Sequence, residues 1–365
     1  MKNSLCSLSL LVLVSSQTLA DDASYIDDIR LPPGFVIEVF ADVPNARSLA
    51  LGDDGTVFVG TRRGDAVYAV VTRGPRASRV IELLDDLDGP NGVAFFGGDL
   101  YVAENTRVTR FADIESKLDD VPDAELLDID LPNERHHGWR YIGFGPDEKL
   151  YIAIGAPCNV CNRSGFGEIV RMNPDGSDRE TYATGVRNSV GFTWHPDTDE
   201  LWFTDNGRDR LGDDVPPCEL NRAAVAGLHF GFPYCHGGEI LDPKFGEDMN
   251  CADFTPPAQK LGPHVAPLGV KFYTGTVFPP EYQGQIFIAE HGSWNRSEKI
   301  GYRISMVRLE QDMPVSYEVF AEGWLQGQSV SGRPVDLLEL PDGSMLVSDD
   351  AAGKIYRIRY EEPSN

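Results

Sequence analysis

Short apolar triplets recur along the chain, and each follows a turn rich in Gly, Pro and charged residues. The triplets are Val57–Val59, Leu100–Val102, Leu150–Ile152, Leu201–Phe203, Ile286–Ile288 and Met345–Val347. β-Branched and aromatic residues that follow turn residues predict strands. The triplets recur every 43 to 59 residues, with one longer gap between residues 202 and 287. No sustained helical periodicity accompanies them.

A repeat of this size, with several strands in each unit, is typical of a β-propeller. The six copies predict an all-β, six-bladed β-propeller that forms one domain over about residues 25–360. A β-sandwich with a chance similarity between its strands is the alternative, but a sandwich does not need such a repeat. The longer gap holds a Gly- and Pro-rich insertion at about residues 234–260, which contains two cysteines.

Polar side chains keep the same register in every repeat. One set precedes the apolar run that leads into each triplet, and it comprises Arg47, Asn91, His137, Arg187 with Asn188, His264 and Arg333. The residues that follow the triplets form a second set: Arg62, Glu104, Ala156, Asn206, His291 and Asp350. Equivalent positions of equivalent blades lie at the same radius, so both sets are expected around one mouth of the central channel. Solvated loops are the alternative, but arginine, histidine and asparagine in register favour a functional ring.

The composition fits an exported protein with a packed core. Of the 365 residues, 41% are hydrophobic, which is enough for a globular core. The N-terminal stretch "MKNSLCSLSLLVLVSSQTLA" has one lysine, an apolar run and a small-residue end. It predicts a signal peptide over residues 1–20 and a periplasmic or extracellular destination. No stretch is long enough for a membrane span, and a net charge of −25 disfavours nucleic acid as a partner.

Five cysteines remain once the predicted signal peptide is removed. In an oxidising compartment, two disulfides and one free thiol are the simplest arrangement. We expect Cys158 to pair with Cys161, and Cys235 to pair with Cys251, which leaves Cys218 free. The "CNVC" stretch could instead be a redox or metal pair, although no second such pair stands elsewhere in the sequence.

The residue types in the predicted ring favour an anionic ligand and a hard cation. Several cations at the mouth of an acidic protein attract an anion, and arginine suits planar carboxylates. Carboxylates and backbone carbonyls suit Ca²⁺. The stretch "NGRD" at residues 206–209 offers such carbonyls, because Gly207 permits a sharp turn. A histidine in the ring could serve as a base near neutral pH.

Longer motifs carry a resemblance to a known family. They are "GVRNSVGFTWHPDTDELWFTDNGRDRLGDDVPPCELN", "AEHGSWNRSEKIGYR" and "GRPVDLLELPDG". The chain resembles the soluble quinoprotein glucose/sorbosone dehydrogenase family, and most closely its L-sorbosone dehydrogenase-like branch. The resemblance implies a six-bladed propeller that binds pyrroloquinoline quinone (PQQ) and Ca²⁺. It also implies oxidation of a small sugar, an aldose or sorbosone-like compound, with electrons passed to a separate acceptor other than NAD.

The resemblance also implies a base and a metal site. His137, in "HHGWRY", matches the family's catalytic base, and the backbone carbonyls of Gly207 and Arg208 match the ligands of the active-site calcium. Ala156 stands where the glucose dehydrogenases have an aspartate that supports the base. His137 is therefore expected to be oriented by some other group.

Cofactor-binding positions follow from the same resemblance. Arg187 and Asn188 match a pair that contacts the quinone, and Asn206 matches a cofactor-contacting glutamine. Arg333 matches a cofactor-binding arginine, and His264 replaces a threonine beside the cofactor.

Other departures keep a second enzyme class open. Gly262 replaces a tryptophan beside the cofactor, and Val335 replaces a second arginine. A calcium-dependent lactonase-type hydrolase on a six-bladed propeller would use the same metal and histidine without a quinone. A binding propeller without catalysis is a third reading, but it leaves His137 and the aligned arginines unexplained.

Overall fold

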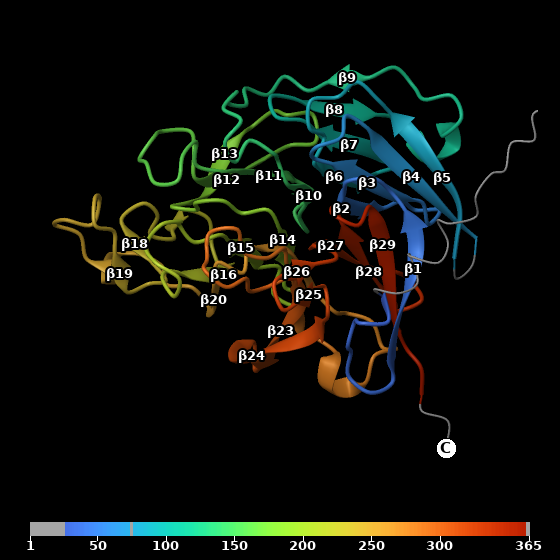
Figure 1. The fold of residues 1–365 in the computed structure, drawn as a ribbon. Coiled ribbons are helices and arrows are strands. Elements are labelled where there is room, and N and C mark those ends of the chain that lie inside the picture. Colours follow the sequence, from blue (N-terminus) through green and yellow to red (C-terminus); the bar gives the residue numbers. More distant parts are fainter. Residues whose placement is uncertain (1–25, 74–75, 363–365) are drawn as a thin grey trace, which may run out of the picture.

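Six sheets are arranged as the blades of a propeller in the computed structural model, which describes residues 26–73 and 76–362 (Figure 1). The first sheet holds β2 (Ala46–Leu51), β3 (Val57–Thr61), β4 (Val67–Arg73) and β5 (Arg76–Leu84), and the second holds β6 (Gly92–Phe96), β7 (Asp99–Ala103), β8 (Val108–Phe111) and β9 (Glu125–Leu126). The third holds β10 (Ile142–Phe144), β11 (Leu150–Ile154), β12 (Glu168–Met172), β13 (Glu180–Thr184) and β17 (Leu228–His229). The predicted six-bladed β-propeller is confirmed.

The remaining three sheets complete the ring. The fourth holds β14 (Phe192–Trp194), β15 (Leu201–Asp205), β16 (Pro217–Ala223) and β20 (Gln259–Pro263), and the fifth holds β21 (Pro267–Phe272), β22 (Ile286–Glu290), β23 (Arg303–Glu310) and β24 (Met313–Glu322). The sixth holds β27 (Pro334–Glu339), β28 (Met345–Asp349), β29 (Lys354–Tyr360) and β1 (Phe35–Asp42). Short elements outside the blades are η1 (Ile114–Lys117), η2 (Cys251–Asp253), η3 (Pro280–Tyr282), and the hairpin of β25 (Leu325–Gln326) and β26 (Ser329–Val330).

Each predicted triplet lies in the second strand of its sheet, and side-chain alternation explains why it is apolar throughout. In β15, Trp202 packs toward the fifth sheet, whereas Leu201 and Phe203 pack toward the third. In β28, Leu346 packs toward the first sheet and Val347 toward the fifth. Successive side chains of a strand point to opposite faces, and here both faces are covered by a neighbouring blade. No triplet residue is more than 2% exposed.

Apolar clusters fill the six interfaces between neighbouring sheets. The cluster between the first and sixth sheets joins Val57 and Val59 to Leu346 and Ile355, so the packing continues around the whole ring. The ring is closed by β1, which pairs antiparallel with β29 and lies beside the C-terminal strands in Figure 1. The first strands of neighbouring sheets contact one another, for example β2 with both β6 and β27.

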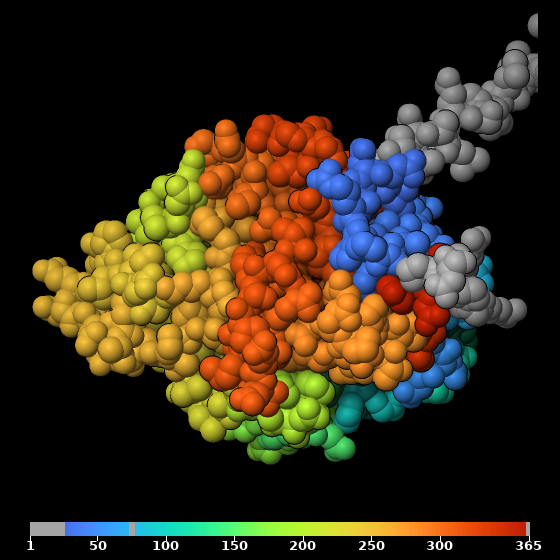
Figure 2. All heavy atoms as spheres, turned by 90° about the horizontal axis from the view of Figure 1, so that it is seen from below, coloured from blue at the N-terminus to red at the C-terminus, as the bar shows by residue number. Residues whose placement is uncertain are grey.

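The predicted insertion extends outward from the blades (Figure 2). It contains the hairpin of β18 (Cys235–His236) and β19 (Ile240–Leu241), and a disulfide joins Cys235 to Cys251. A second disulfide joins Cys158 to Cys161, and Cys218 is free and buried. All three expectations for the cysteines are therefore confirmed.

The signal peptide stays a prediction, and the structure bears on membrane association only through its described helices. The predicted signal peptide over residues 1–20 lies outside the described residues. Among residues 26–73 and 76–362, no helix is long and apolar enough to cross a membrane.

Candidate functional site

A polar cavity of about 300 Å³ brings most of the predicted site residues together. Seven of the eight predicted residues line it, namely His137, Arg187, Asn188, Asn206, Gly207, His264 and Arg333. They lie before the first strand or after the second strand of their sheets, as do Arg62 and His291, which also line the cavity. Arg47 lines it from the start of β2. Members of the two polar sets therefore meet at one mouth.

His137 is held in one orientation by the backbone of the third sheet. Its Nδ1 lies 2.8 Å from the carbonyl oxygen of Ala156. A carbonyl only accepts hydrogen bonds, so Nδ1 carries the proton and Nε2 of the neutral ring keeps a free lone pair. The residue takes a left-handed conformation with φ of 51°, and a side chain on Gly155 would collide with its Cβ. The backbone of Ala156 is thus the group that orients His137.

The surroundings of His137 keep its ring neutral. Burial lowers the pKa of His137 well below the usual value, and the positive charge of Arg187 lowers it further. The ring of His136 lies 4.1 Å from that of His137, but His136 is exposed and does not line the cavity. His137 is therefore able to accept a proton at neutral pH.

Arg187 is buried and fixed by a network that includes a residue not expected from the sequence. Its Nε and Nη2 donate to the backbone and side-chain oxygens of Asn159, at 2.9 and 3.0 Å. Its Nη2 also pairs with Asp209 at 3.0 Å, and the Asp209 N–H donates to the same Asn159 side chain. Asn159 thus connects Arg187 to the loop that carries Gly207. Its place between Cys158 and Cys161 was the only signal for it in the sequence.

A second network surrounds Asp350. Its carboxylate lies 3.0 Å from Arg47, 2.9 Å from Arg333 and 3.0 Å from the ring of His291. Burial alone would raise the pKa of Asp350, but the hydrogen bond from His291 and the two arginine charges lower it. Asn91 does not face the cavity; it is buried behind Arg47 and accepts a hydrogen bond from its Nε.

The loop after β15 carries Gly207 and Arg208, the two residues expected to bind calcium. Gly207 lines the cavity, but its φ is not positive, so a left-handed turn is not the reason for glycine here. A Cβ at Gly207 would lie 2.8 Å from the carbonyl oxygen of Pro217, so the reason is close backbone packing. The side chain of Arg208 points away from the cavity and pairs with the fully buried Asp242 of the insertion.

The remaining predicted residues are placed by hydrogen bonds to the backbone. Asn206 donates to the carbonyl oxygens of Asn188, in the loop before β14, and of Pro267, in β21 of the fifth sheet. His264 lies 2.8 Å from the carbonyl oxygen of Gly212 and has a left-handed conformation with φ of 60°. These contacts tie the loop after β15 to the loop before β14 and to the start of the fifth sheet.

Some ring positions stay outside the cavity. Glu104 does not line it; its buried carboxylate accepts hydrogen bonds from the Asp88 N–H and from Arg107. Val335, which the resemblance matched to a family arginine, is buried with Val190 and Leu268 and packs against Trp139. The register alone does not separate these inward positions from those that reach the cavity.

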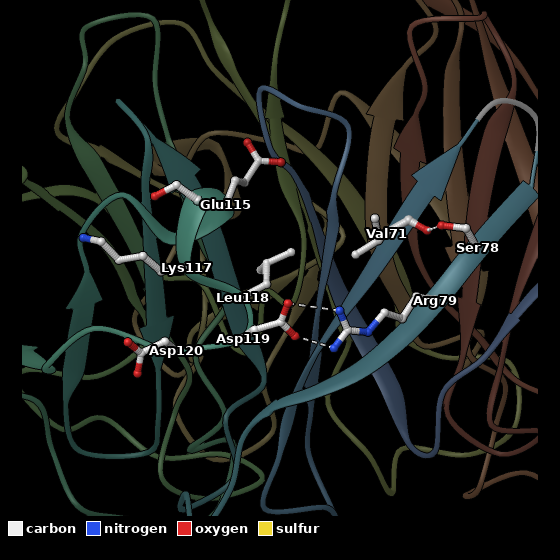
Figure 3. Close-up of a pocket in the computed structure, with 9 residues that line it drawn as sticks. Val71, Ser78, Arg79, Glu115, Lys117, Leu118, Asp119 and Asp120 are labelled. Carbon is white, nitrogen blue, oxygen red and sulfur yellow. Dashed lines mark hydrogen bonds and ion pairs between the residues drawn. The ribbon is translucent and has the colours of Figure 1, made fainter.

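A larger cavity of about 560 Å³ lies between β4, β5 and η1 (Figure 3). Its charged side chains are exposed and partly paired with one another, as Arg79 is with Asp119. Groups that are exposed and already paired gain little from a ligand. We therefore place the functional site in the smaller cavity, where the polar groups are buried.

Comparisons with known proteins support the fold described above. The glucose/sorbosone dehydrogenase family model matches residues 101–357. An uncharacterised protein of Borreliella burgdorferi is 34% identical over 373 residues, which cover 97% of each chain. The holo PQQ domain of pyranose dehydrogenase from Coprinopsis cinerea has a TM-score of 0.81 at 17% identity, covering 91% of this chain and 97% of that chain.

A PQQ-bound aldose sugar dehydrogenase from Streptomyces coelicolor has a TM-score of 0.62 at 18% identity, covering 91% of this chain and all of that one (100%). At these identities the solved structures support the fold alone. The family model covers well over half of the chain. The chain belongs to the glucose/sorbosone dehydrogenase family.

Proposed function

We propose that the protein is an exported quinoprotein that oxidises the anomeric hydroxyl of an aldose or sorbosone-like sugar with PQQ and Ca²⁺. The observation that carries the proposal is a buried, neutral His137, with Nδ1 bound to Ala156, inside an arginine-lined cavity. The family to which the chain belongs supports the reaction class. Two disulfides support an oxidising compartment.

The cavity fits an acceptor-rich, polyanionic cofactor. The buried Nε of Arg333 and Nε1 of Trp139 have no hydrogen-bond partner among the described residues. Buried donors without partners cost free energy, and carboxylate or carbonyl oxygens of a ligand would satisfy them. PQQ is a planar tricarboxylate, so Arg187, Asn188, Asn206, His264 and Arg333 are the residues that we assign to it.

Calcium would take its oxygens chiefly from the backbone. No group of three His, Cys, Asp or Glu side chains that could hold a metal occurs within residues 26–73 and 76–362. The carbonyls of Gly207 and Arg208 are the protein ligands that we propose, and hard oxygen donors of this kind suit Ca²⁺. The ion pair between Arg208 and Asp242 holds the Arg208 side chain away from that site.

His137 acts as the general base in the proposed reaction. Its Nε2 takes the proton of the anomeric hydroxyl, while Ala156 holds the ring in the correct tautomer. Arg187 stays charged beside it and disfavours a protonated ring before the sugar binds. When bound, PQQ and its cation supply the electron acceptor and the Lewis acid for the loss of hydride.

The experiment that tests the function is a visible absorption spectrum of the protein with PQQ and Ca²⁺. We expect the spectrum of bound PQQ to change on addition of aldoses, because the quinone is reduced. A spectrum that no sugar alters would overturn the dehydrogenase assignment in favour of the lactonase-type hydrolase. Lactone hydrolysis by the calcium-loaded protein is the matching assay.

Removing either cavity arginine should weaken cofactor binding. We expect Arg333→Ala and Arg187→Ala each to weaken PQQ binding by about 1.5–3 kcal/mol, the scale of a hydrogen bond to a charged group. Arg187→Ala should also loosen the loop of Asp209, because Asn159 and Asp209 lose a shared partner. Isothermal titration measures the PQQ affinity of both variants, and unchanged affinity in both rules out the assigned pose.

A further inference from the structure

Arg62 is a cation in the cavity that the proposed reaction does not use. Its guanidinium carbon lies over the face of the Trp139 ring, 3.5 Å from the ring centre, in a cation–π contact. Among the described residues, no hydrogen bond or ion pair joins Arg62 to another side chain. Burial lowers its pKa to about 9, with a further contribution from the charge of Arg47. The guanidinium thus keeps its donors free.

The nearby carboxylate is not available to Arg62. Asp350 already binds Arg47, Arg333 and His291. A partly buried arginine without an anionic partner is costly, and a carboxylate that enters with a ligand would offset that cost. The contact with Trp139 restrains the guanidinium, which prepares it to bind a carboxylate.

The position of Arg62 near the proposed base favours the sugar, rather than the cofactor, as the source of the carboxylate. Trp139 carries Arg62 on its face, and the ring of His137 lies 5.8 Å from the same Trp139 ring. A sugar whose anomeric hydroxyl reaches His137 would therefore extend past Trp139 to Arg62. Of the residues assigned to the cofactor, Arg187 precedes the fourth sheet and Arg333 precedes the sixth, whereas Arg62 follows β3 in the first.

We propose that Arg62, held over Trp139, binds the carboxylate of an acidic sugar, so that the substrate class is a uronic-acid-type aldose. This inference rests on the proposed function for the reacting end of the sugar. It adds a recognition site for the opposite end. The planar carboxylate and the charge of the cavity wall select this class over neutral aldoses.

Two glycosides test the site without any turnover. Methyl β-D-glucuronide and methyl β-D-glucoside differ only at the carboxylate, and neither has a free anomeric hydroxyl to oxidise. With PQQ- and Ca²⁺-loaded protein, we expect calorimetry to show about 10- to 100-fold tighter binding of the glucuronide, the scale of a charged hydrogen bond. In Arg62→Gln this preference should fall to less than about threefold.

Four further measurements keep the result unambiguous. Arg62→Lys, which keeps a charge but not the planar fork, should retain an intermediate preference. Arg79→Gln removes an exposed arginine from the remote cleft of Figure 3 and should leave the preference unchanged. Melting temperatures of all variants show whether each remains folded, and the glucuronide preference should weaken with added salt.

The PQQ affinity of Arg62→Gln distinguishes the two sources of carboxylate. Affinity close to that of the wild type, together with a lost glucuronide preference, supports the substrate site. Weakened PQQ binding without any glucuronide preference in the wild type assigns Arg62 to the cofactor and overturns the proposal. Oxidation of neutral aldoses with no glucuronide preference overturns the Arg62 site alone. A glucuronide preference without oxidation of any sugar overturns the dehydrogenase function and leaves the site intact.

Discussion

Replacement of His137 by alanine should lower turnover by about 10²- to 10⁴-fold, the range for a general base. PQQ and Ca²⁺ should bind nearly as in the wild type, because His137 is assigned to neither. His137→Asn is the matched control for structure, since asparagine tolerates the left-handed conformation that this position adopts. It also lacks a base, so it should lose turnover to the same extent while it preserves the melting temperature.

The pH dependence of the wild-type rate adds a second readout for His137. The free base is the active form, so the rate should rise with pH through the pKa of His137 and then stay level. Burial and the charge of Arg187 lower that pKa well below 6.5, so the rate should already be level at pH 6.5 and fall only in more acidic solution. Stopped-flow reduction of bound PQQ measures the profile. Wild-type turnover in His137→Ala or in His137→Asn would show that His137 is not the general base.

The blades could be predicted because their sequence signal is local. A strand covered on both faces has no position for a polar residue, so each second strand appears as an uninterrupted apolar triplet. Because successive side chains alternate between the two faces, Trp202 packs against one neighbouring blade and Leu201 against the other. The number of repeats predicted the number of blades. No separate sequence motif marks the pairing of β1 with β29, which closes the ring.

The candidate site could be predicted only for residues that occupy equivalent positions in the six repeats. Register placed His137, Arg187 and Arg333 at one mouth, because equivalent loops of equivalent blades meet there. It could not show that the carbonyl of Ala156 orients His137, since a backbone contact leaves no trace in residue type. Asn159 was missed for a related reason: it lies in a disulfide loop outside the repeat.

Gly207 shows how a correct choice of residue can rest on a wrong physical reason. The sequence suggested a left-handed turn, whereas the structure shows a negative or extended φ and close contact with the backbone of the following strand. A Cβ would stand 2.8 Å from the Pro217 carbonyl oxygen and 3.3 Å from Pro216. Both neighbours are ring or backbone atoms that move little, so any side chain must displace the loop instead.

We therefore expect Gly207→Val to weaken calcium binding by about 100-fold, the upper end of the effect of displaced supporting groups at metal sites. Gly207→Ala should give a smaller loss in the same direction, because it adds the clashing Cβ without the two methyl groups. Arg208→Lys tests the side chain next to it: a cation remains for the buried Asp242, and the backbone is unchanged, so the loss should be smaller still. The calcium dependence of PQQ reconstitution measures all three affinities, and melting temperatures verify that each variant is folded. Equal calcium affinity in Gly207→Val and the wild type would show that the metal binds elsewhere.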